Sequence, residues 1–363
     1  MYPAPAHRVR IRRLLTAAAA LSLIGVLGAC STKPAAAGGG EKGTAAELRL
    51  GFFANVTHAT PLVGVDKGLY TKELGSTKLK TQVFNAGPAA IEAIFAGALD
   101  ASYIGPNPAI NAFSKSRGEA IRIIAGATSG GAALIVRPEI TSAAQLKGKK
   151  IATPQLGGTQ DVALRSWLDS QGLKTDPSGK GDVNILANTQ NAQTLELFQA
   201  GRIDGGWLPE PWASRLVLEA GAKVLVDERT LWPEGRFVTT HLIVSTDFLK
   251  KYPATVEALL RGHVAANDWI AKNPADAKAA VNAELAKLAG KPLKPDVLDR
   301  AWSNIEVTND PVASSLATSA EHAEQVGLLK KTQLKGIYDL GPLNAILAKD
   351  GQPEASDAGL GSS

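Results

Sequence analysis

The chain is poor in cysteine, methionine and aromatic residues, and each scarcity limits what the protein can be. It has one cysteine and one methionine among 363 residues, and Phe, Trp and Tyr together make up 5%. A single cysteine excludes a disulfide bond within the chain. The apolar run from Leu14 to Ala29 is shorter than the roughly 20 residues that a membrane-spanning helix needs. The overall composition, 45% hydrophobic and 20% charged, is nevertheless that of a chain that buries a core.

The first 29 residues have the pattern of an export signal. Four arginines, at positions 8, 10, 12 and 13, precede the apolar run, and Cys30 follows it directly. A basic start, a short apolar stretch and small residues before a cleavage site are typical of a secretory signal peptide. The sequence LGAC at 27–30 resembles the bacterial lipobox, in which a signal peptidase cuts before an acylated cysteine. We therefore predict a lipoprotein signal at 1–29 and a lipid anchor such as palmitate at Cys30.

Two other interpretations of this segment stay open. The cysteine can be incidental to an ordinary secretory signal, and the pair Arg12-Arg13 can mark twin-arginine export. In each case the body of the protein is predicted to be extracytoplasmic, and with the lipid it is anchored to the cell membrane. Small and Gly-rich residues predict a flexible tether at 30–46, and the small, polar end of the chain predicts a disordered tail at 351–363.

The charge balance gives no indication of a nucleic-acid partner. The chain has 39 basic and 34 acidic residues, but four of the basic residues belong to the predicted signal, which contains no acid. The rest of the chain is therefore close to neutral. Binding to nucleic acid requires a basic surface that attracts phosphates, so no nucleic-acid partner is predicted.

Short apolar strands alternate with helices as far as residue 244, and the chain is then mainly helical. This order predicts an α/β fold with two mixed, mostly parallel sheets flanked by helices. The predicted strands are 47–53, 83–84, 100–104, 121–127, 150–153, 183–186, 202–206, 223–226 and 237–244. The predicted helices include 61–70, 89–96, 162–170, 253–272, 274–288 and 295–304.

An internal repeat suggests that the two sheets are built alike. The sequences IEAIFAGALDASYIGPN at 91–107 and LELFQAGRIDGGWLPEP at 195–211 match at an offset of 104 residues, so Asp100 corresponds to Asp204 and Tyr103 to Trp207. The alternative is that helix–Gly–strand units look alike wherever they occur. With a true repeat, both lobes present equivalent loops at the ends of their strands, where α/β proteins bind ligands.

Polar and small residues occupy these loops. The candidate ligand-binding residues are Asn55, His58, Asn107, Thr128, Ser129, Gly158, Thr159 and Gln160. Glycines allow a ligand to approach the backbone, and the amide groups at a helix start attract anions, so residues 157–160 predict an anion site. A simple helix cap by Thr159 is the alternative and is compatible with such a site. The G-x-S-x-G and H-E-x-x-H motifs are absent, and no catalytic residue, metal site or cofactor is predicted.

Five segments together carry a family resemblance. They are RLGFF, AGALDASYIGPNPAI, IATPQLGGTQDVALRSWL, GRIDGGWLPEPWASRLVLEAGAKVL and WPEGRFVTTHLIVSTDFLKKYP. In this order, and with the lipobox, the chain from Leu48 to about Leu347 resembles the substrate-binding lipoproteins of ABC importers. It is most similar to the branch that handles aliphatic sulfonates, taurine, nitrate and pyrimidine-type precursors.

The resemblance implies a two-lobed, periplasmic-binding-protein-like fold with a hinged cleft. Lobe one would comprise 47–135 plus 237–350, and lobe two 136–236. The cleft would capture a small anionic solute, with an aliphatic sulfonate as the first expectation, and deliver it to a membrane permease and its ATPase. The family's anion site maps best onto Gly158, Thr159 and Gln160, and less directly onto Asn55 and Asn107.

Under this interpretation, Tyr103 and Trp207 would line the cleft as one aromatic residue from each lobe. Glu210 lies in the same bend as Trp207, and two roles for it stay open. It can pair with the amine of a taurine-like solute or with an arginine, or it can be an acidic residue at a helix start, where acids are favoured.

Two alternatives from other classes remain at this stage. Relatives of this fold include pyrimidine-precursor synthases, but their cysteine-rich, iron-linked chemistry does not suit a chain with one cysteine in an export signal. A ligand-sensing lipoprotein that docks on a receptor is the other alternative. The sequence favours a binding protein and not an enzyme.

Overall fold

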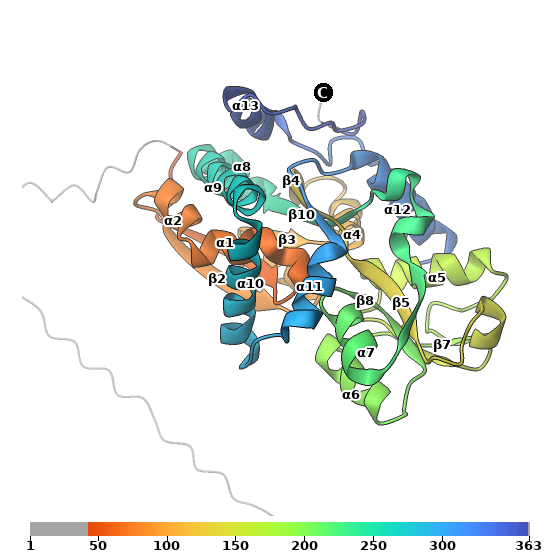
Figure 1. Cartoon of the computed structure of the whole chain (residues 1–363). Helices are drawn as coiled ribbons and strands as arrows, with labels where there is room; N and C mark the ends of the chain where they lie inside the picture. The colour runs from red at the N-terminus through yellow and green to blue at the C-terminus, as the bar shows by residue number, and fades with distance from the viewer. Residues whose placement is uncertain (1–42, 362–363) are drawn as a thin grey trace, which may run out of the picture. The chain divides into compact units, whose positions relative to one another are not determined.

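Two β-sheets flanked by helices organise the protein (Figure 1). The computed structural model describes residues 43–361. The first sheet contains, in spatial order, β11 (Ile305–Val307), β4 (Ile121–Gly130), β10 (Val238–Ser245), β3 (Ala101–Ile104), β1 (Glu47–Phe53) and β2 (Lys78–Phe84). The second contains β7 (Asn184–Leu186), β6 (Lys150–Ala152), β8 (Gly205–Pro209), β5 (Ala132–Val136) and β9 (Lys223–Asp227). The predicted α/β class is confirmed, whereas the predicted signal, Cys30 and most of the predicted tether lie outside the described residues.

The helices follow the strands in the predicted alternation and then dominate the C-terminal part. The α-helices are α1 (Ala59–Asp66), α2 (Leu69–Leu74), α3 (Gly87–Phe95), α4 (Pro106–Lys115), α5 (Thr159–Ser170), α6 (Asn191–Gln199), α7 (Trp212–Ala220), α8 (Thr246–Lys251), α9 (Pro253–Lys272), α10 (Pro274–Ala289), α11 (Pro295–Ser303), α12 (Ala313–Gln325) and α13 (Gly341–Lys349). Short 3₁₀ turns are η1 (Val56–His58), η2 (Ala143–Leu146), η3 (Glu228–Leu231) and η4 (Pro233–Gly235). Within residues 43–361, no helix combines the length and the apolar character that crossing a membrane requires.

Both sheets are mixed, as predicted, but parallel pairs are not in the majority in either sheet. Strand β1 pairs in parallel with β2 and β3, and β6 pairs in parallel with β7 and β8. Strands β10 and β5 run antiparallel to both of their neighbours. These are the strands that first enter each sheet after the chain has crossed from the other one, so they do not arrive through a βα unit that would make them parallel.

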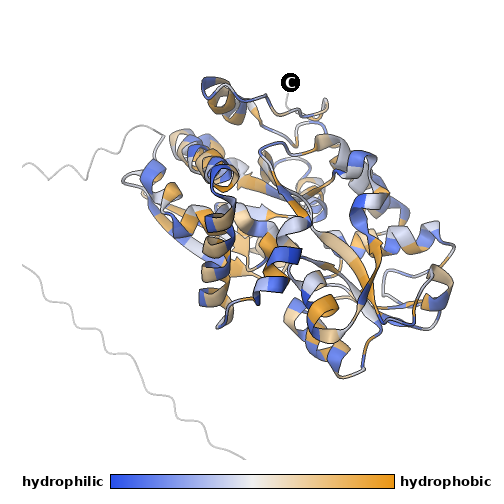
Figure 2. Cartoon of the chain, in the orientation of Figure 1, coloured by the Kyte–Doolittle hydropathy of each residue, from blue (hydrophilic) through white to orange (hydrophobic). Residues whose placement is uncertain are grey.

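The second sheet is buried on both faces. Along β5, Leu134 and Val136 pack with α5, whereas Ala133 and Ile135 pack with α6 and α7. This alternation follows from the two-residue period of a strand. Figure 2 shows the consequence: hydrophobic residues are concentrated in the strands, and the helices carry both hydrophobic and hydrophilic residues.

The internal repeat is confirmed by the element bounds. Helix α3 spans residues 87–95 and α6 spans 191–199, so the offset of 104 residues superimposes both of their ends. Gly97 and Gly201 follow them with left-handed φ angles of 66° and 72°, a conformation that glycine adopts without strain. The same sequence pattern therefore builds the same helix–turn–strand unit twice.

The repeated aspartates hold equivalent positions in the two units. Asp100 accepts a hydrogen bond from the backbone amide of Arg49, at the start of β1, at 2.8 Å. Asp204 accepts one from the amide of Lys150, at the start of β6, also at 2.8 Å. The backbone carbonyl of each aspartate receives an amide from the neighbourhood of the antiparallel strand, Ser245 in one case and Arg137 in the other. Each carboxylate thus secures the first residues of a parallel strand.

The chain enters the second sheet earlier than predicted. Strand β4 ends in the first sheet at Gly130, and β5 begins in the second sheet at Ala132. Residues 132–135 therefore belong with the second sheet and not with lobe one. Gly130 and Gly131 both have left-handed φ angles, 75° and 76°, and this turn lets adjacent residues join different sheets.

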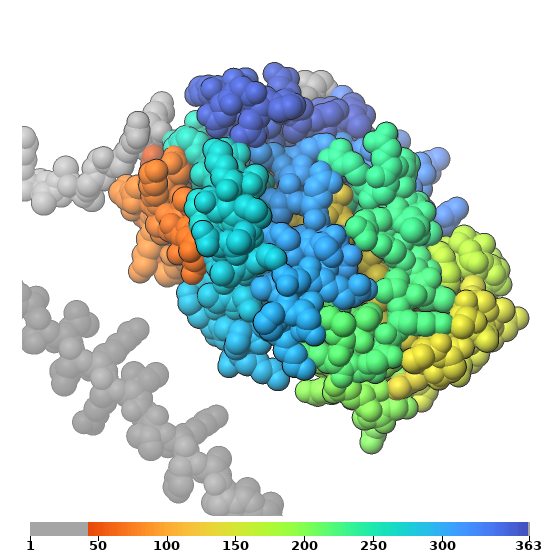
Figure 3. Space-filling view, in the orientation of Figure 1, coloured from red at the N-terminus to blue at the C-terminus, as the bar shows by residue number. Residues whose placement is uncertain are grey.

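The C-terminal helices contact the second sheet as well as the first. In Figure 3 the blue segment after residue 290 packs against the green segment that contains α7. Asn304, directly after α11, donates a hydrogen bond to Glu210 at 2.7 Å, and the Lys294 ammonium lies 3.8 Å from Glu219. The second sheet is thus held by the C-terminal part of the chain in addition to the two connecting segments.

Residues 351–361 pack against the rest of the protein, although their composition predicts a disordered tail. The side chain of Asn344 donates to the carbonyl of Ala355 at 3.0 Å and accepts from its amide at 2.9 Å. Ala355 is buried, and Gly361 forms a β-bridge with Tyr338. The composition of this segment is typical of disorder, but the Asn344 side chain makes both backbone hydrogen bonds of Ala355 that a neighbouring strand would otherwise make.

We predict that Asn344→Ala releases this segment, because both hydrogen bonds to Ala355 are lost. The amide of Ala355 should then exchange with solvent at least tenfold faster, measured by hydrogen exchange. Asn282 brackets Leu293 in the same way, with bonds of 3.1 and 2.7 Å, and provides the matched control. Asn282→Ala should leave the exchange of Ala355 unchanged, and equal effects of both variants would contradict the assignment.

Candidate functional site

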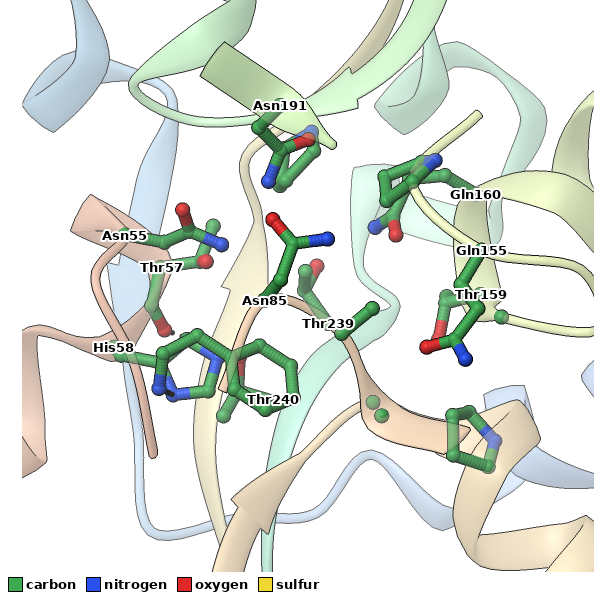
Figure 4. A pocket seen from close by; sticks show the side chains of 18 residues that line it. Asn55, Thr57, His58, Asn85, Gln155, Thr159, Gln160, Asn191, Thr239 and Thr240 are labelled. Atoms are coloured by element: carbon green, nitrogen blue, oxygen red, sulfur yellow. Dashed lines mark hydrogen bonds between the residues drawn. The ribbon is translucent and has the colours of Figure 1, made fainter. Parts of the chain in front are cut away.

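A pocket lies where the strand ends of the two sheets meet (Figure 4). Its cavity volume is about 30 Å³, so the pocket is narrow. The first sheet and its loops contribute Phe53, Asn55, Thr57, His58, Asn85, Ala86, Gly87, Gly105, Pro108, Thr239 and Thr240. The second contributes Pro154, Gln155, Gly158, Thr159, Gln160, Asn191 and Pro209.

Four helices begin at this pocket. They are α3, α4, α5 and α6, and none of them has a side chain that caps its first amides. The first amides of an α-helix lack partners within the helix, and the helix dipole adds positive potential there. Pro88 in α3 and Pro106 and Pro108 in α4 supply no N–H, so α5 and α6 have the fuller sets of free amides, while all four helices place positive dipole ends at the pocket.

The polar side chains that line the pocket are uncharged. Among the described lining residues there is no Lys, Arg, Asp or Glu. Burial lowers the pKa of His58 to about 3, because the charged imidazolium loses its solvation. The Phe53 amide donates to His58 Nδ1 at 3.3 Å, which leaves Nε2 as the protonated nitrogen of a neutral ring.

A buried carboxylate shapes the loop at the start of α5. Asp161 accepts hydrogen bonds from the Thr153 hydroxyl at 2.9 Å, the Gly157 amide at 3.0 Å and Arg165 Nε at 3.1 Å. Asp161 and Arg165 are both almost fully buried. Asp161 thus fixes the turn before Gly158 and Thr159 while its charge is balanced by Arg165.

The two sheets approach closely at Thr159 and Gly105. A Cβ atom placed on Gly105 would lie 2.2 Å from the Thr159 hydroxyl oxygen. Gly105 directly precedes α4 and Thr159 begins α5. This contact therefore joins a helix start beside the first sheet to a helix start beside the second. A side chain at position 105 would force these helix ends apart.

The structure brings five of the predicted site residues together. Asn55, His58, Gly158, Thr159 and Gln160 all line the pocket, from loops of both sheets. Thr159 and Asn55 are buried, and Asn55 Oδ1 accepts a hydrogen bond from the indole nitrogen of Trp212 at 2.9 Å. These residues lie together because each follows the end of a strand, and the strand ends of the two sheets meet at the pocket.

The two predicted aromatic residues lie elsewhere, which corrects their assignment to the cleft. The Tyr103 hydroxyl is 2.6 Å from that of Tyr70 and 2.7 Å from His263 Nδ1, within the helical layer of α2 and α9. Trp207 is fully buried against α5 and near Trp167. Both residues lie within strands, and strand side chains point toward the covering helices rather than along the strand to its end.

Four further predicted residues do not line the pocket. Asn107 donates to the Ser319 carbonyl at 3.1 Å, and Ser129 Oγ accepts from the Phe237 amide at 3.3 Å. Thr128 donates to the Thr57 carbonyl at 2.7 Å and so supports a pocket loop without facing the pocket.

Glu210 is the fourth, and its environment favours the helix-start role. Its carboxylate accepts hydrogen bonds from the amide and the hydroxyl of Ser214, in the first turn of α7, each at 3.0 Å, and from Asn304. Burial raises its pKa, and these hydrogen bonds oppose that effect.

Several lining residues were missed from the sequence. Asn85 follows β2, Gln155 follows β6, and Asn191 begins α6, so each occupies the same kind of position as the residues that were found. The sequence signal that could have identified them is a polar residue shortly after a predicted strand. Thr240 lies inside β10, and no local pattern separates it from an ordinary strand threonine.

The arrangement of two helix-flanked sheets with a pocket at their strand ends is that of the periplasmic-binding-protein-like folds. The chain belongs to the NMT1-like family, whose sequence profile matches residues 41–287. This agrees with the resemblance found in the sequence.

Named relatives are binding proteins. The taurine-binding periplasmic protein of Escherichia coli is 28% identical over 226 residues, 61% of this chain and 67% of the relative. The putative aliphatic sulfonates-binding protein of the same organism is 26% identical over 196 residues, 53% of this chain and 57% of the relative. These names agree with a binding protein and not an enzyme.

Solved structures share the fold. The alkanesulfonate-binding protein SsuA from Xanthomonas axonopodis, bound to MOPS, is 22% identical, with a TM-score of 0.65 over 79% of this chain and 96% of that one. The nitrate-binding protein NrtA from Synechocystis is 18% identical, with a TM-score of 0.68 over 85% of this chain and 86% of that one.

The position of Trp207 generates a pH prediction. Its indole nitrogen donates to Glu228 at 2.6 Å, and burial raises the pKa of Glu228 from 4.5 to about 7. Between these values the folded state holds a proton that the unfolded state has lost, so the free energy of unfolding should fall as the pH rises. Urea unfolding at several pH values between 4.5 and 7.5 measures this slope.

Glu228→Gln should remove this contribution to the slope, because the amide does not titrate. Glu234→Gln, at an exposed position, is the matched control and should keep the wild-type slope. A Glu228→Gln variant that loses stability with rising pH as steeply as the wild type would contradict the assignment.

Proposed function

We propose that the protein is the solute-binding component of an ABC importer and captures a small organic anion, with aliphatic sulfonates as the preferred class. The observation that carries this proposal is the convergence of four uncapped helix starts on a pocket with no charged lining residue among those described. Such amides and dipoles stabilise an anion without a buried counter-ion that would have to be desolvated.

The names of the relatives support the solute class. They include taurine-, aliphatic sulfonates- and nitrate/nitrite-binding proteins. A sulfonate offers three acceptor oxygens to the pocket's donors, among them the amides at the start of α5, the Thr159 hydroxyl and His58 Nε2. Asn55, Asn85, Gln155 and Asn191 add side-chain amides around the same space, as Figure 4 shows.

The pocket chemistry favours a sulfonate without an amine over taurine. Glu210, the acid that the sequence offered as a partner for an ammonium group, is occupied by Ser214 and Asn304 outside the pocket. An ammonium group placed among the positive helix ends would lack a carboxylate partner in the lining. A simple alkanesulfonate avoids that cost.

The cellular context follows from the export pattern and the relatives. A periplasmic name for one relative supports an extracytoplasmic location, and Cys30 after the predicted signal supports a lipid anchor to the membrane. Structural neighbours described as parts of ABC-type import systems support a permease and its ATPase as partners. A lipid at Cys30 would hold the protein at the membrane, close to its permease.

A binding screen tests the proposal. Purified protein is heated with ethanesulfonate, taurine, nitrate or a pyrimidine, and the shift in melting temperature is measured. A ligand at 100 times its Kd adds about 2.7 kcal/mol of stability. At equal ligand concentrations, ethanesulfonate should give a larger shift than taurine. A shift with the pyrimidine alone would reject the anion class, and no shift with any anion would reject the proposed function.

Thr159→Ala should weaken ethanesulfonate binding by about tenfold or more, since a hydrogen bond to a charged group contributes about 1.5–3 kcal/mol. Titration calorimetry measures the affinity, and the melting temperature without ligand should change little. Thr159→Ser keeps the hydroxyl and is the matched control. Equal affinities of the alanine and wild-type proteins would remove Thr159 from the site.

A further inference from the structure

Trp212 connects the second sheet to a pocket residue of the first. It is the first residue of α7, and its indole nitrogen lies 2.9 Å from Oδ1 of Asn55, in the loop after β1. Trp212 itself does not line the pocket, whereas Asn55 does. The hydrogen bond therefore reaches the pocket through Asn55.

The chemistry of the indole group decides which way the Asn55 amide points. An indole N–H donates hydrogen bonds and accepts none, so the Asn55 atom beside it must be the oxygen. The amide nitrogen then lies on the other side of the group. Figure 4 shows that nitrogen on the side of Asn85, within the pocket. Asn55 is thereby presented to the pocket as a donor.

Both partners of this hydrogen bond are held in place. The guanidinium of Arg215 lies 4.8 Å from the centroid of the Trp212 ring and is paired with Glu219 at 2.8 Å. The Asn55 carbonyl accepts the His58 amide at 3.0 Å, and the neighbouring Val56 amide donates to the Glu210 carbonyl at 3.1 Å. The bend that supplies Trp212 thus also supports the backbone beside Asn55.

We propose that Trp212 is a positioning residue that sets the polarity of the pocket toward anions by fixing the Asn55 amide. This inference rests on the proposed function, because it concerns the affinity for an anion. Without the indole N–H, the amide is free to rotate and to present its oxygen, and an oxygen facing an anion is repelled. Trp212 therefore acts on the solute without contacting it.

A double-mutant cycle tests the inference, with ethanesulfonate as the probe in titration calorimetry. Trp212→Phe keeps an aromatic ring and removes the donor, and it should weaken binding about three- to tenfold, the range of one hydrogen bond. Asn55→Ala should weaken binding by at least as much. In the Asn55→Ala background, Trp212→Phe should change the affinity less than twofold, because the group through which it acts is gone.

Trp269→Phe, on α9 and not in the pocket lining, is the matched control and should keep wild-type affinity. An unchanged affinity of Trp212→Phe, or effects of the two substitutions that simply add, would overturn the inference.

A second measurement keeps the test independent of ligand binding. The indole N–H resonance of Trp212, assigned by its loss in Trp212→Phe, should exchange with solvent faster in Asn55→Ala than in the wild type. If none of the anions binds the wild type, the proposed function fails and the effect on anion affinity fails with it, while this measurement still tests whether Trp212 holds the Asn55 amide. An indole resonance that does not respond to Asn55→Ala would overturn the inference.

Discussion

The four helix starts around the pocket, none of them with a capping side chain, are the constraint on which the pocket depends. The first amides of a helix need partners from outside the helix, and α3, α4, α5 and α6 lack a capping side chain. Acidic residues nearby are committed elsewhere: Asp161 to Arg165 and its own loop, and Glu210 to the start of α7. The four helix starts border one pocket, and their positive dipole ends favour negative charge there.

The repeat explains why both sheets contribute such donors. Each half places a helix, a glycine turn and an aspartate in the same order, and each aspartate secures the start of a parallel strand. Loops at the carboxyl ends of those strands then lead into helices whose amino ends point the same way. Gly105 lets Thr159 approach from the other half, so two equivalent edges share one pocket.

The aromatic residues show where the repeat misled. The correspondence between Tyr103 and Trp207 holds in the structure, since both lie in equivalent strands and both are fully buried. The prediction was wrong about the direction in which these two side chains point. A residue inside a strand faces a helical layer, whereas a residue just beyond the strand faces the end of the sheet, and sequence spacing alone separates these positions poorly. Asn55 and Asn85 lie just beyond β1 and β2 and do line the pocket.

The sequence itself determined the α/β class, the repeat, most strands and helices, and the Gly-rich loop at 157–160 that lines the pocket, because strand alternation, glycine turns and helix starts are local patterns. The tertiary structure decided which polar residues meet. It paired Trp212 with Asn55, joined Glu210 to Asn304, and held the C-terminal segment through Asn344. These partners are between 11 and 157 residues apart in the chain. Their contacts depend on packing between elements, and no local pattern records that packing.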